Sequence, residues 1–127
     1  MFGIDRVCSR KKLLILGAGG HGKVVADIAI KMNQWDTIAF LDDNEEIRSS
    51  MDIEVIGKIN DAKLYIRDFD MFVAIGNNDI RENIQNLLES AGANIPVLIH
   101  PSAVIGQQVD IGSGTVIMAG AIVNCCT

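Results

Sequence analysis

The sequence predicts an α/β fold: a doubly wound parallel-sheet domain over residues 11–100, followed over residues 101–127 by the first hexapeptide repeats of a left-handed parallel β-helix. Three observations predict it. An apolar run is followed at once by glycines, strand-like and helix-like segments alternate as far as residue 99, and aliphatic residues then recur every six positions. Hydrophobic residues make up 49% and charged residues 21% of the 127 residues, as in a folded globular protein.

The first strand, helix and second strand form one βαβ unit. The unbroken apolar run Leu13–Leu16 predicts a strand buried on both faces, as in a parallel sheet. Asp36–Leu41 is a second β-rich run, and it ends in Asp42–Asp43. Between them, apolar residues recur at helical spacing from Gly22 onward, namely Val24, Val25, Ile28, Ala29 and Met32.

The next elements follow a polar stretch, residues 44–52. Ile53 and Val55–Ile56 predict a short strand, and Asn60 is placed to cap a helix through Ile66. Met71–Ile75 predicts another buried strand, which ends in glycine and asparagine.

A clearer helix follows that strand. Asp79 and Glu82 have the spacing of a capping box, Gly92 provides a C-terminal stop, and Ile95–Ile99 predicts one more strand. The apolar residues between the two ends fall on one helical face: Ile80, Ile84, Leu87, Leu88 and Ala91.

From Ala103 the period becomes six. The two aligned series are Ile105, Ile111, Ile117 and Val123, and, two positions earlier, Ala103, Val109, Thr115 and Ala121. In a left-handed β-helix each hexapeptide forms one side of a triangular coil, so four hexapeptides make about one and a third coils. Because such a coil has an unpaired apolar edge, we expect self-association.

Charge and composition exclude several function classes. Eleven basic against 16 acidic residues give a net charge of −5, which disfavours nucleic acid and anionic membranes, and 5% aromatic residues are too few for a base-stacking surface. No apolar run is long enough to span a membrane, and Met1–Lys12 does not fit a secretory signal, so we expect a cytoplasmic protein. The cysteines Cys8, Cys125 and Cys126 have no disulfide or zinc-binding spacing.

The glycine-rich stretch Gly17–Gly22 directly follows the first strand and opens the first helix. Its glycines allow a tight turn and let backbone N–H groups and the helix N-terminus approach a phosphate. Asp42, 25 residues after Gly17, stands where a ribose-binding acid is expected. The alternative is that the glycines serve only the turn.

Three nucleotide ligands compete for this loop. A dinucleotide oxidoreductase would use Asp42 on the adenosine ribose, but the chain leaves no room for a hydride-transfer domain. Gly17–Lys23 also matches GxxxxGK, but Val24 replaces the hydroxyl that would bind Mg²⁺ in a P-loop ATPase. The third ligand is a nucleotide sugar, whose diphosphate would occupy the same loop.

Other polar residues are candidates at the same sheet edge. His21, inside the glycine loop, can donate to a phosphate or sugar oxygen, and one of Asp42 and Asp43 can accept from a ribose or base. Gly76–Asn77 ends the Met71–Ile75 strand beside Arg81, or alternatively only caps the next helix. His100 is interpreted as a linker histidine that satisfies a backbone group.

Four segments together resemble one family: GAGGHGKVVADIA, FLDD, FVAIGNNDIRENI and LIHPSAVIG, in that order. The chain resembles the bacterial sugar O- and N-acyltransferases typified by sialic acid O-acetyltransferase and UDP-4-amino-sugar N-acetyltransferase. The resemblance implies a Rossmann-like domain that binds a UDP-sugar or other nucleotide-sugar acceptor, and a β-helix that forms a homotrimer and binds acetyl-CoA between subunits.

The resemblance also implies residue roles. Gly19, Gly20 and His21 would hold the diphosphate, Asp42 and Asp43 the uridine side, and Gly76 and Asn77 the neighbouring wall. The family's catalytic histidine lies on a later coil and matches neither His21 nor His100, so no catalytic residue and no metal ligand is assigned here. We therefore expect a truncated acyltransferase with acceptor binding but no transfer. The alternative is a stand-alone nucleotide-sugar-binding or NAD-binding module without catalysis.

Overall fold

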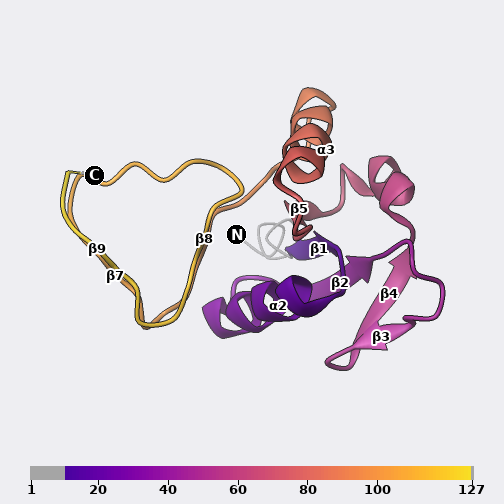
Figure 1. The fold of residues 1–127 in the computed structure, drawn as a ribbon, viewed down its shortest axis with the longest axis horizontal. Coiled ribbons are helices and arrows are strands. Elements are labelled where there is room, and N and C mark those ends of the chain that lie inside the picture. The colour runs from indigo at the N-terminus through magenta and orange to yellow at the C-terminus, as the bar shows by residue number, and fades with distance from the viewer. Residues whose placement is uncertain (1–10, 127) are drawn as a thin grey trace, which may run out of the picture.

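The structure is a computed structural model that describes residues 11–126. Its centre is a five-stranded sheet in the order β3-β4-β2-β1-β5, in which the pairs β1–β2, β1–β5 and β2–β4 are parallel and β3–β4 is antiparallel. The strands are β1 (Lys12–Leu16), β2 (Thr37–Leu41), β3 (Ser49–Ser50), β4 (Ile53–Gly57) and β5 (Asp70–Val73). The helical segments are α2 (Gly20–Met32), the 3₁₀ helix η1 (Ile59–Tyr65) and α3 (Asn78–Ser90). Figure 1 shows α2 and α3 on opposite sides of the sheet.

Strand β1 lies at the centre of the sheet, between β2 and β5. Its four apolar residues, Leu13–Leu16, are each fully buried, which confirms the prediction of a strand covered on both faces. Leu13 and Ile15 pack with residues of α2, while Leu14 and Leu16 pack with residues of η1 and α3. This alternation is that of a doubly wound sheet, as the sequence predicts.

The two faces of the sheet have separate cores. On the α2 face the core includes Val25, Ala26, Ile28, Ala29, Phe40, Phe72 and Leu98. On the other face it includes Ala39, Leu41, Ala62, Met71, Val73 and Leu88. Since Leu98 follows the last helix, the first core also anchors the chain that comes after the sheet.

The segment 98–126, called the coil below, forms two short parallel pairs. Strand β6 (Leu98–Ile99) pairs with β8 (Val116–Ile117), and β7 (Val104–Ile105) pairs with β9 (Ile122–Val123). In both pairs the partner residue lies 18 positions further along the chain, which is three hexapeptides. Figure 1 shows this segment running around a three-sided loop beside the sheet.

Three details of the sequence prediction are wrong. The strand predicted over Ile95–Ile99 contains only β6, which pairs with β8 and not with the main sheet. The N-cap of α3 is Asn77, not Asp79, because the Asn77 side chain reaches the Ile80 N–H at 3.0 Å. The helix expected after Asn60 is the short 3₁₀ helix η1, which begins at Ile59.

The expected apolar face of α3 is only partly covered. Leu88 is buried and Ile84 is half-buried, but Leu87 is 65% exposed and Ile80 is 49% exposed. The helix therefore contacts the sheet through one narrow row of residues.

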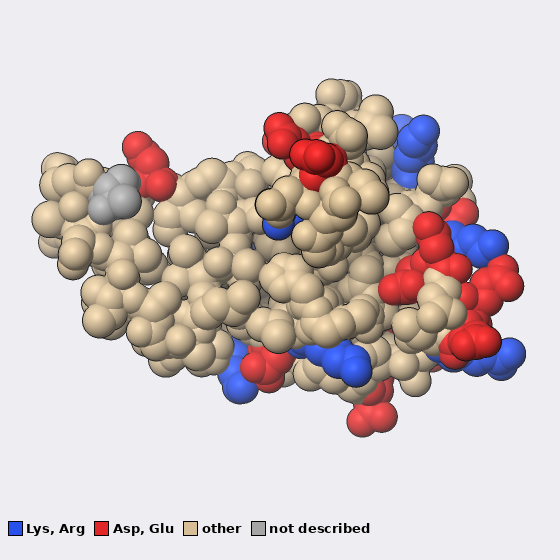
Figure 2. Space-filling model, in the orientation of Figure 1, with Lys and Arg blue, Asp and Glu red and all other residues tan. Residues whose placement is uncertain are grey.

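Charged residues are distributed unevenly. No lysine or arginine follows Arg81, and Asp110 is the only charged residue after His100. In Figure 2 the acidic and basic side chains gather on the α/β domain, whereas the coil at the left is almost free of them. Within residues 11–126, no helix has the length and apolarity needed to cross a membrane.

Candidate functional site

The glycine loop joins the carboxyl end of β1 to α2, at the point where the sheet order reverses. Strand β1 connects through α2 to β2 on one side, while β5 pairs with β1 on the other. In open α/β sheets, ligands bind in the crevice at this position.

Gly17 turns the chain out of β1. Its N–H donates to the Leu41 carbonyl at 2.7 Å, and its φ of 110° is a conformation that L side chains rarely adopt. A Cβ at this position would lie 2.7 Å from the Ala74 carbonyl oxygen. Gly17 is therefore required by the tight packing of the loop between β2 and β5.

The other glycines of the site divide into two kinds. At Gly22, a Cβ would overlap the Gly17 carbonyl oxygen, so packing requires glycine there too. At Gly19, Gly20 and Gly76, a Cβ would meet no atom within 4 Å, and none of the three has a positive φ. The fold does not require these three glycines, but their lack of a side chain leaves the backbone open to a ligand.

The N-termini of α2 and α3 differ in how their N–H groups are satisfied. Gly19 caps α2 without a side-chain hydrogen bond, and the first turn of α2 has no acidic residue. In α3, Asn77 is a side-chain cap and Asp79 lies in the first turn. The N-terminus of α2 thus retains the partial positive charge and free donors that favour an anion. The capping interpretation of Asn77 is confirmed, and its contact with a ligand stays a prediction.

Asp42 joins the glycine loop to the end of β2. Its Oδ2 accepts from the Ala18 N–H at 2.8 Å and its Oδ1 from the Asn44 N–H at 2.8 Å. Asp43 is exposed, and its Oδ1 accepts from the Ile59 N–H at 3.0 Å. Both carboxylates therefore brace backbone, and Asp42 is the one that positions the loop.

The two histidines lie in different surroundings. His21 is half-buried in the first turn of α2, next to the glycine loop. His100 lies in the coil, where its Nδ1 accepts from the Ser102 N–H at 3.0 Å and is 2.9 Å from the Ser102 hydroxyl. The Ser102 hydroxyl in turn accepts from the Gly120 N–H at 3.0 Å. The interpretation of His100 as a residue that satisfies a backbone group is thus confirmed.

A hollow of about 520 Å³ opens beside the glycine loop, toward β3. Its lining includes Ala18, Gly19, Lys23, Arg48 and Ser50. Two cations, Lys23 and Arg48, and one carboxylate, Glu46, therefore lie next to the N-terminus of α2. Ser50 is 8% exposed, and its hydroxyl has no hydrogen-bond partner among the described residues.

No motif in the sequence marks Lys23, Arg48 and Ser50 as site residues. Lys23 fits only a P-loop pattern, and Arg48 and Ser50 lie in the polar stretch before β4. Their position depends on β3 pairing with β4 at the edge of the sheet. A two-residue strand leaves no periodicity, so no local signal was available to find them.

A smaller hollow of about 290 Å³ lies on the other side of Asp42, against Val55–Lys58. At its rim Lys58 Nζ is 2.8 Å from Glu45 Oε1. The hydrogen bond from Lys58 lowers the pKa of Glu45 and the same bond raises the pKa of Lys58. Both groups are fully exposed to solvent, so this ion pair places charge at the rim of the hollow but adds little rigidity to it.

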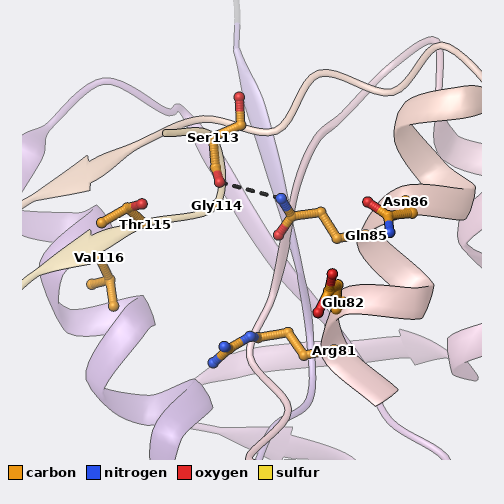
Figure 3. A pocket seen from close by; sticks show the side chains of 8 residues that line it. All are labelled: Arg81, Glu82, Gln85, Asn86, Ser113, Gly114, Thr115 and Val116. Carbon is orange, nitrogen blue, oxygen red and sulfur yellow. Dashed lines mark hydrogen bonds between the residues drawn. The ribbon is translucent and has the colours of Figure 1, made fainter. Parts of the chain in front are cut away.

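Arg81 lies away from the glycine loop, in a cleft of about 430 Å³ between α3 and the coil. Figure 3 shows residues of α3 on one side of this cleft and Ser113–Val116 on the other. The cleft is polar, and Gln85 bridges it (Figure 3).

Metal ligands and thiols do not form a centre in this region. Among residues 11–126, no group of three or more His, Cys, Asp or Glu side chains is placed to hold a metal ion. Cys125 and Cys126 are both exposed at the end of the coil. Cys8 lies outside the described residues.

A doubly wound α/β domain with an open, uncapped glycine loop at the switch point is the architecture that many nucleotide-binding domains share. Residues 12–88 match the family model described as the PglD N-terminal domain. The chain belongs to this family, and the relatives it matches are sugar acetyltransferases, as the resemblance predicts.

Three similar proteins show the extent of the match. The UDP-N-acetylbacillosamine N-acetyltransferase of Bacillus subtilis is 34% identical over 112 residues, which are 86% of this chain and 52% of the relative. The acetyltransferase domain of PglB from Neisseria gonorrhoeae superposes with a TM-score of 0.84 at 36% identity, over 92% of this chain and 66% of that one. PerB from Caulobacter crescentus, in complex with CoA and GDP-perosamine, has a TM-score of 0.80 at 29% identity, over 91% and 55%. The chain thus spans about half the length of the Bacillus relative.

The cofactor of the solved neighbours is acetyl-CoA or CoA. The Neisseria domain was also solved in complex with acetyl-CoA. In the coil described here, Asp110 is the only charged side chain.

Proposed function

We propose that this chain is the acceptor-binding part of an acetyl-CoA-dependent sugar N-acetyltransferase, and that its α/β domain binds a nucleotide sugar, specifically a UDP-amino sugar. Gly19, Gly20 and His21 hold the diphosphate at the N-terminus of α2. Asp42 and Asp43 lie on the uridine side, and Gly76 and Asn77 form the neighbouring wall.

The observation that carries this proposal is the open space at Gly19, Gly20 and Gly76. These residues need neither a positive φ nor close packing, yet all three lie at the carboxyl edge where β1 and β5 adjoin. A ligand that approaches the backbone N–H groups explains a glycine at such a position, and a diphosphate is the ligand such donors favour. The cations Lys23 and Arg48 beside the loop outnumber the one carboxylate there, Glu46, and support an anionic ligand.

We further propose domain bounds of 11–100 for the nucleotide-sugar domain and 101–127 for a left-handed β-helix segment. The 18-residue step between paired strands supports three hexapeptides per coil. In this proposal the β-helix forms a homotrimer and carries the acetyl-CoA site, as the family resemblance implies.

The chemistry that such a protein performs is acyl transfer. The sugar amine attacks the thioester carbonyl, the C–N bond forms as the C–S bond breaks, and a base accepts the amine proton while the CoA thiolate leaves. This chain contains only His21 and His100 as histidines, and His100 Nδ1 is engaged by Ser102. The residues described here therefore bind and orient the acceptor, and we expect no acetyl transfer above background when the 127-residue chain is assayed alone.

The test is a calorimetric titration of the chain with a UDP-4-amino sugar or UDP-N-acetylglucosamine, beside NADH. We expect heat of binding for the UDP sugar alone. His21→Ala and Asp42→Ala should each weaken it, the second by releasing the loop. The proposal would be contradicted if the chain preferred NADH, or if the parent and both variants bound the UDP sugar with equal affinity.

A matched pair of glycine variants separates the loop from the fold. Gly20→Leu and Gly112→Leu both place a side chain where a Cβ meets no atom within 4 Å, one at the loop and one in the coil. Gly20→Leu should weaken UDP-sugar binding by about tenfold or more, the size of one lost hydrogen bond to a charged group. Gly112→Leu should bind like the parent chain.

A further inference from the structure

The coil is attached to the α/β domain first through apolar contacts with α2. Leu98 is fully buried in the core that α2 covers, and Val116, its partner in the β6–β8 pair, packs against the same core. The Ile99 N–H also points at the Met32 sulfur, at 3.4 Å. This attachment fixes one side of the coil along the β6–β8 edge.

A second attachment comes from α3, on the other side of the cleft in Figure 3. Gln85 Nε2 donates to the Ser113 carbonyl of the coil at 3.2 Å and to Glu89 Oε1 of its own helix at 3.0 Å. The Glu89 contact holds the Gln85 amide in the orientation that reaches Ser113. Gln85 is half-buried, while its helix neighbours Glu82 and Asn86 are exposed.

The Gln85 side-chain amide packs directly against Gly114. A Cβ at Gly114 would overlap the Gln85 side-chain oxygen and lie 2.7 Å from its amide carbon. Gly114 also has a φ of 76°, and its N–H donates to the Pro96 carbonyl at 3.3 Å. Gly114 is thus held between the linker before β6 and the side chain from α3.

We propose that Gln85 and Gly114 form a latch that sets the angle between the α/β domain and the coil. Contacts at α2 alone leave the coil free to pivot about the β6–β8 edge, because the cleft of about 430 Å³ lies between α3 and the Ser113–Val116 turn. The latch spans this cleft and removes that freedom. Gln85 is a positioning residue in this account, not a residue that contacts the acceptor.

The functional consequence rests on the proposed function. If the acceptor is held at the carboxyl edge of the sheet and the acyl donor on the β-helix, the angle between the two parts sets the distance between the reacting groups. Misplacing reacting groups by about 1 Å can cost about a hundredfold in rate. A latch at the junction would hold that distance before either substrate binds.

The test measures the angle itself. Trp35 is the only tryptophan of the chain and is buried in the α/β core. With Cys8→Ser and Cys126→Ser in place, an acceptor dye on the exposed Cys125 reports the distance from the core to the end of the coil by time-resolved energy transfer. We expect Gln85→Ala to broaden the distance distribution at an unchanged unfolding midpoint of the α/β domain. Gln107→Ala, the same change at an exposed glutamine of the coil, should leave it as in the parent.

Two further variants separate a latch from simple packing. Gln85→Glu keeps the size but removes the donor, so it should broaden the distribution as Gln85→Ala does. A double-mutant cycle uses hydrogen exchange at the Leu98 amide, which donates to the Thr115 carbonyl, as its readout. With Gln85 present, Gly114→Ala should speed this exchange by about fivefold, which corresponds to the loss of one net hydrogen bond. The effect should be smaller with Gln85→Ala, where the overlap is relieved.

Unchanged distance distributions in both Gln85 variants, or equal effects of Gly114→Ala in the two backgrounds, would overturn the latch. The result is independent of ligand. Absence of UDP-sugar binding by the parent chain would overturn the proposed function, and the distance measurement would still decide the latch.

Discussion

The α/β domain and the coil differ in how they hold themselves together. Every buried residue of the described range lies at or before Leu98, and the remaining coil residues are half-buried or exposed. Sheet and helices enclose a core on both faces of β1, whereas one turn of the coil covers its own aliphatic residues only in part. The α/β domain is therefore stabilised by its own core, while the coil depends on what stacks against it.

The two regions also differ in chemistry. The glycine loop, its bracing carboxylates and the cations beside them all belong to the α/β domain. The coil contributes one charged residue, Asp110. The charged groups of the candidate site are therefore concentrated in the region that folds around its own core.

The largest expected effect contrasts one side chain from each region. Phe40→Ala removes a fully buried ring from the core under α2 and should lower the free energy of unfolding by about 3–5 kcal/mol. Ile122→Ala trims a side chain that is 72% exposed and should change it by less than about 0.5 kcal/mol. Urea denaturation of the two variants checks both values. Equal losses would show that the coil shares the core of the domain.

A second contrast lies within the glycine loop. Gly22→Ala places a Cβ on the Gly17 carbonyl and should cost about 3 kcal/mol, the upper range for an overpacked site. Gly20→Ala adds a Cβ in open space and should change stability by less than about 0.5 kcal/mol. Thermal unfolding of both proteins tests the division of glycines into those required by packing and those left open. The division fails if Gly20→Ala is the more damaging change.

A third prediction concerns the carboxylates that brace the loop. Asp42→Ala leaves the N–H groups of Ala18 and Asn44 without their acceptor and should cost about 2 kcal/mol. Asp43→Ala removes one exposed acceptor, from Ile59, and should cost about 1 kcal/mol or less. Hydrogen exchange at Ala18 and Ile59 separates the two effects. Faster exchange at Ala18 in Asp43→Ala would contradict the assignment.

The smallest effect is expected at the Glu45–Lys58 pair, which is fully exposed. The pKa of Glu45 is lowered by its bond to Lys58, so its contribution to stability is present above its ordinary pKa and is lost as pH falls through the lowered value. The pKa of Lys58 is raised, so its contribution is lost only as pH rises through that raised value. Lys58→Ala should therefore leave the unfolding midpoint at neutral pH within error. A clear loss that 1 M salt does not remove would show a stronger pair than solvent screening allows.

Much of the fold could be predicted because its signals are local. The run Leu13–Leu16 and the helical spacing from Gly22 onward each lie within one element and indicate what that element buries. The last strand was misplaced because the apolar run Ile95–Ile99 fits a sheet strand and a coil strand equally well. Only the pairing partner 18 positions further along the chain, which is Ile117 for Ile99, decides between them.

The site was predictable where it follows a strand end and not where it depends on pairing across the sheet. Gly19, Gly20 and Asp42 stand directly after strands, and their position follows from the parallel order. Arg48 and Ser50 come beside the loop only because β3 turns back on β4. The bracing role of Asp42 also escaped the sequence, since an acid after the second strand fits a ribose contact as well as a backbone contact.

Binding of a UDP sugar at the glycine loop can be tested by mapping amide chemical shifts in the ¹⁵N-labelled chain during a titration with a UDP sugar. We expect the largest changes at Gly19, Gly20, His21 and Gly76, with little change along α3 beyond its first turn. Changes confined to the cleft between Gln85 and Gly114, with the glycine loop unmoved, would contradict it and place the ligand elsewhere.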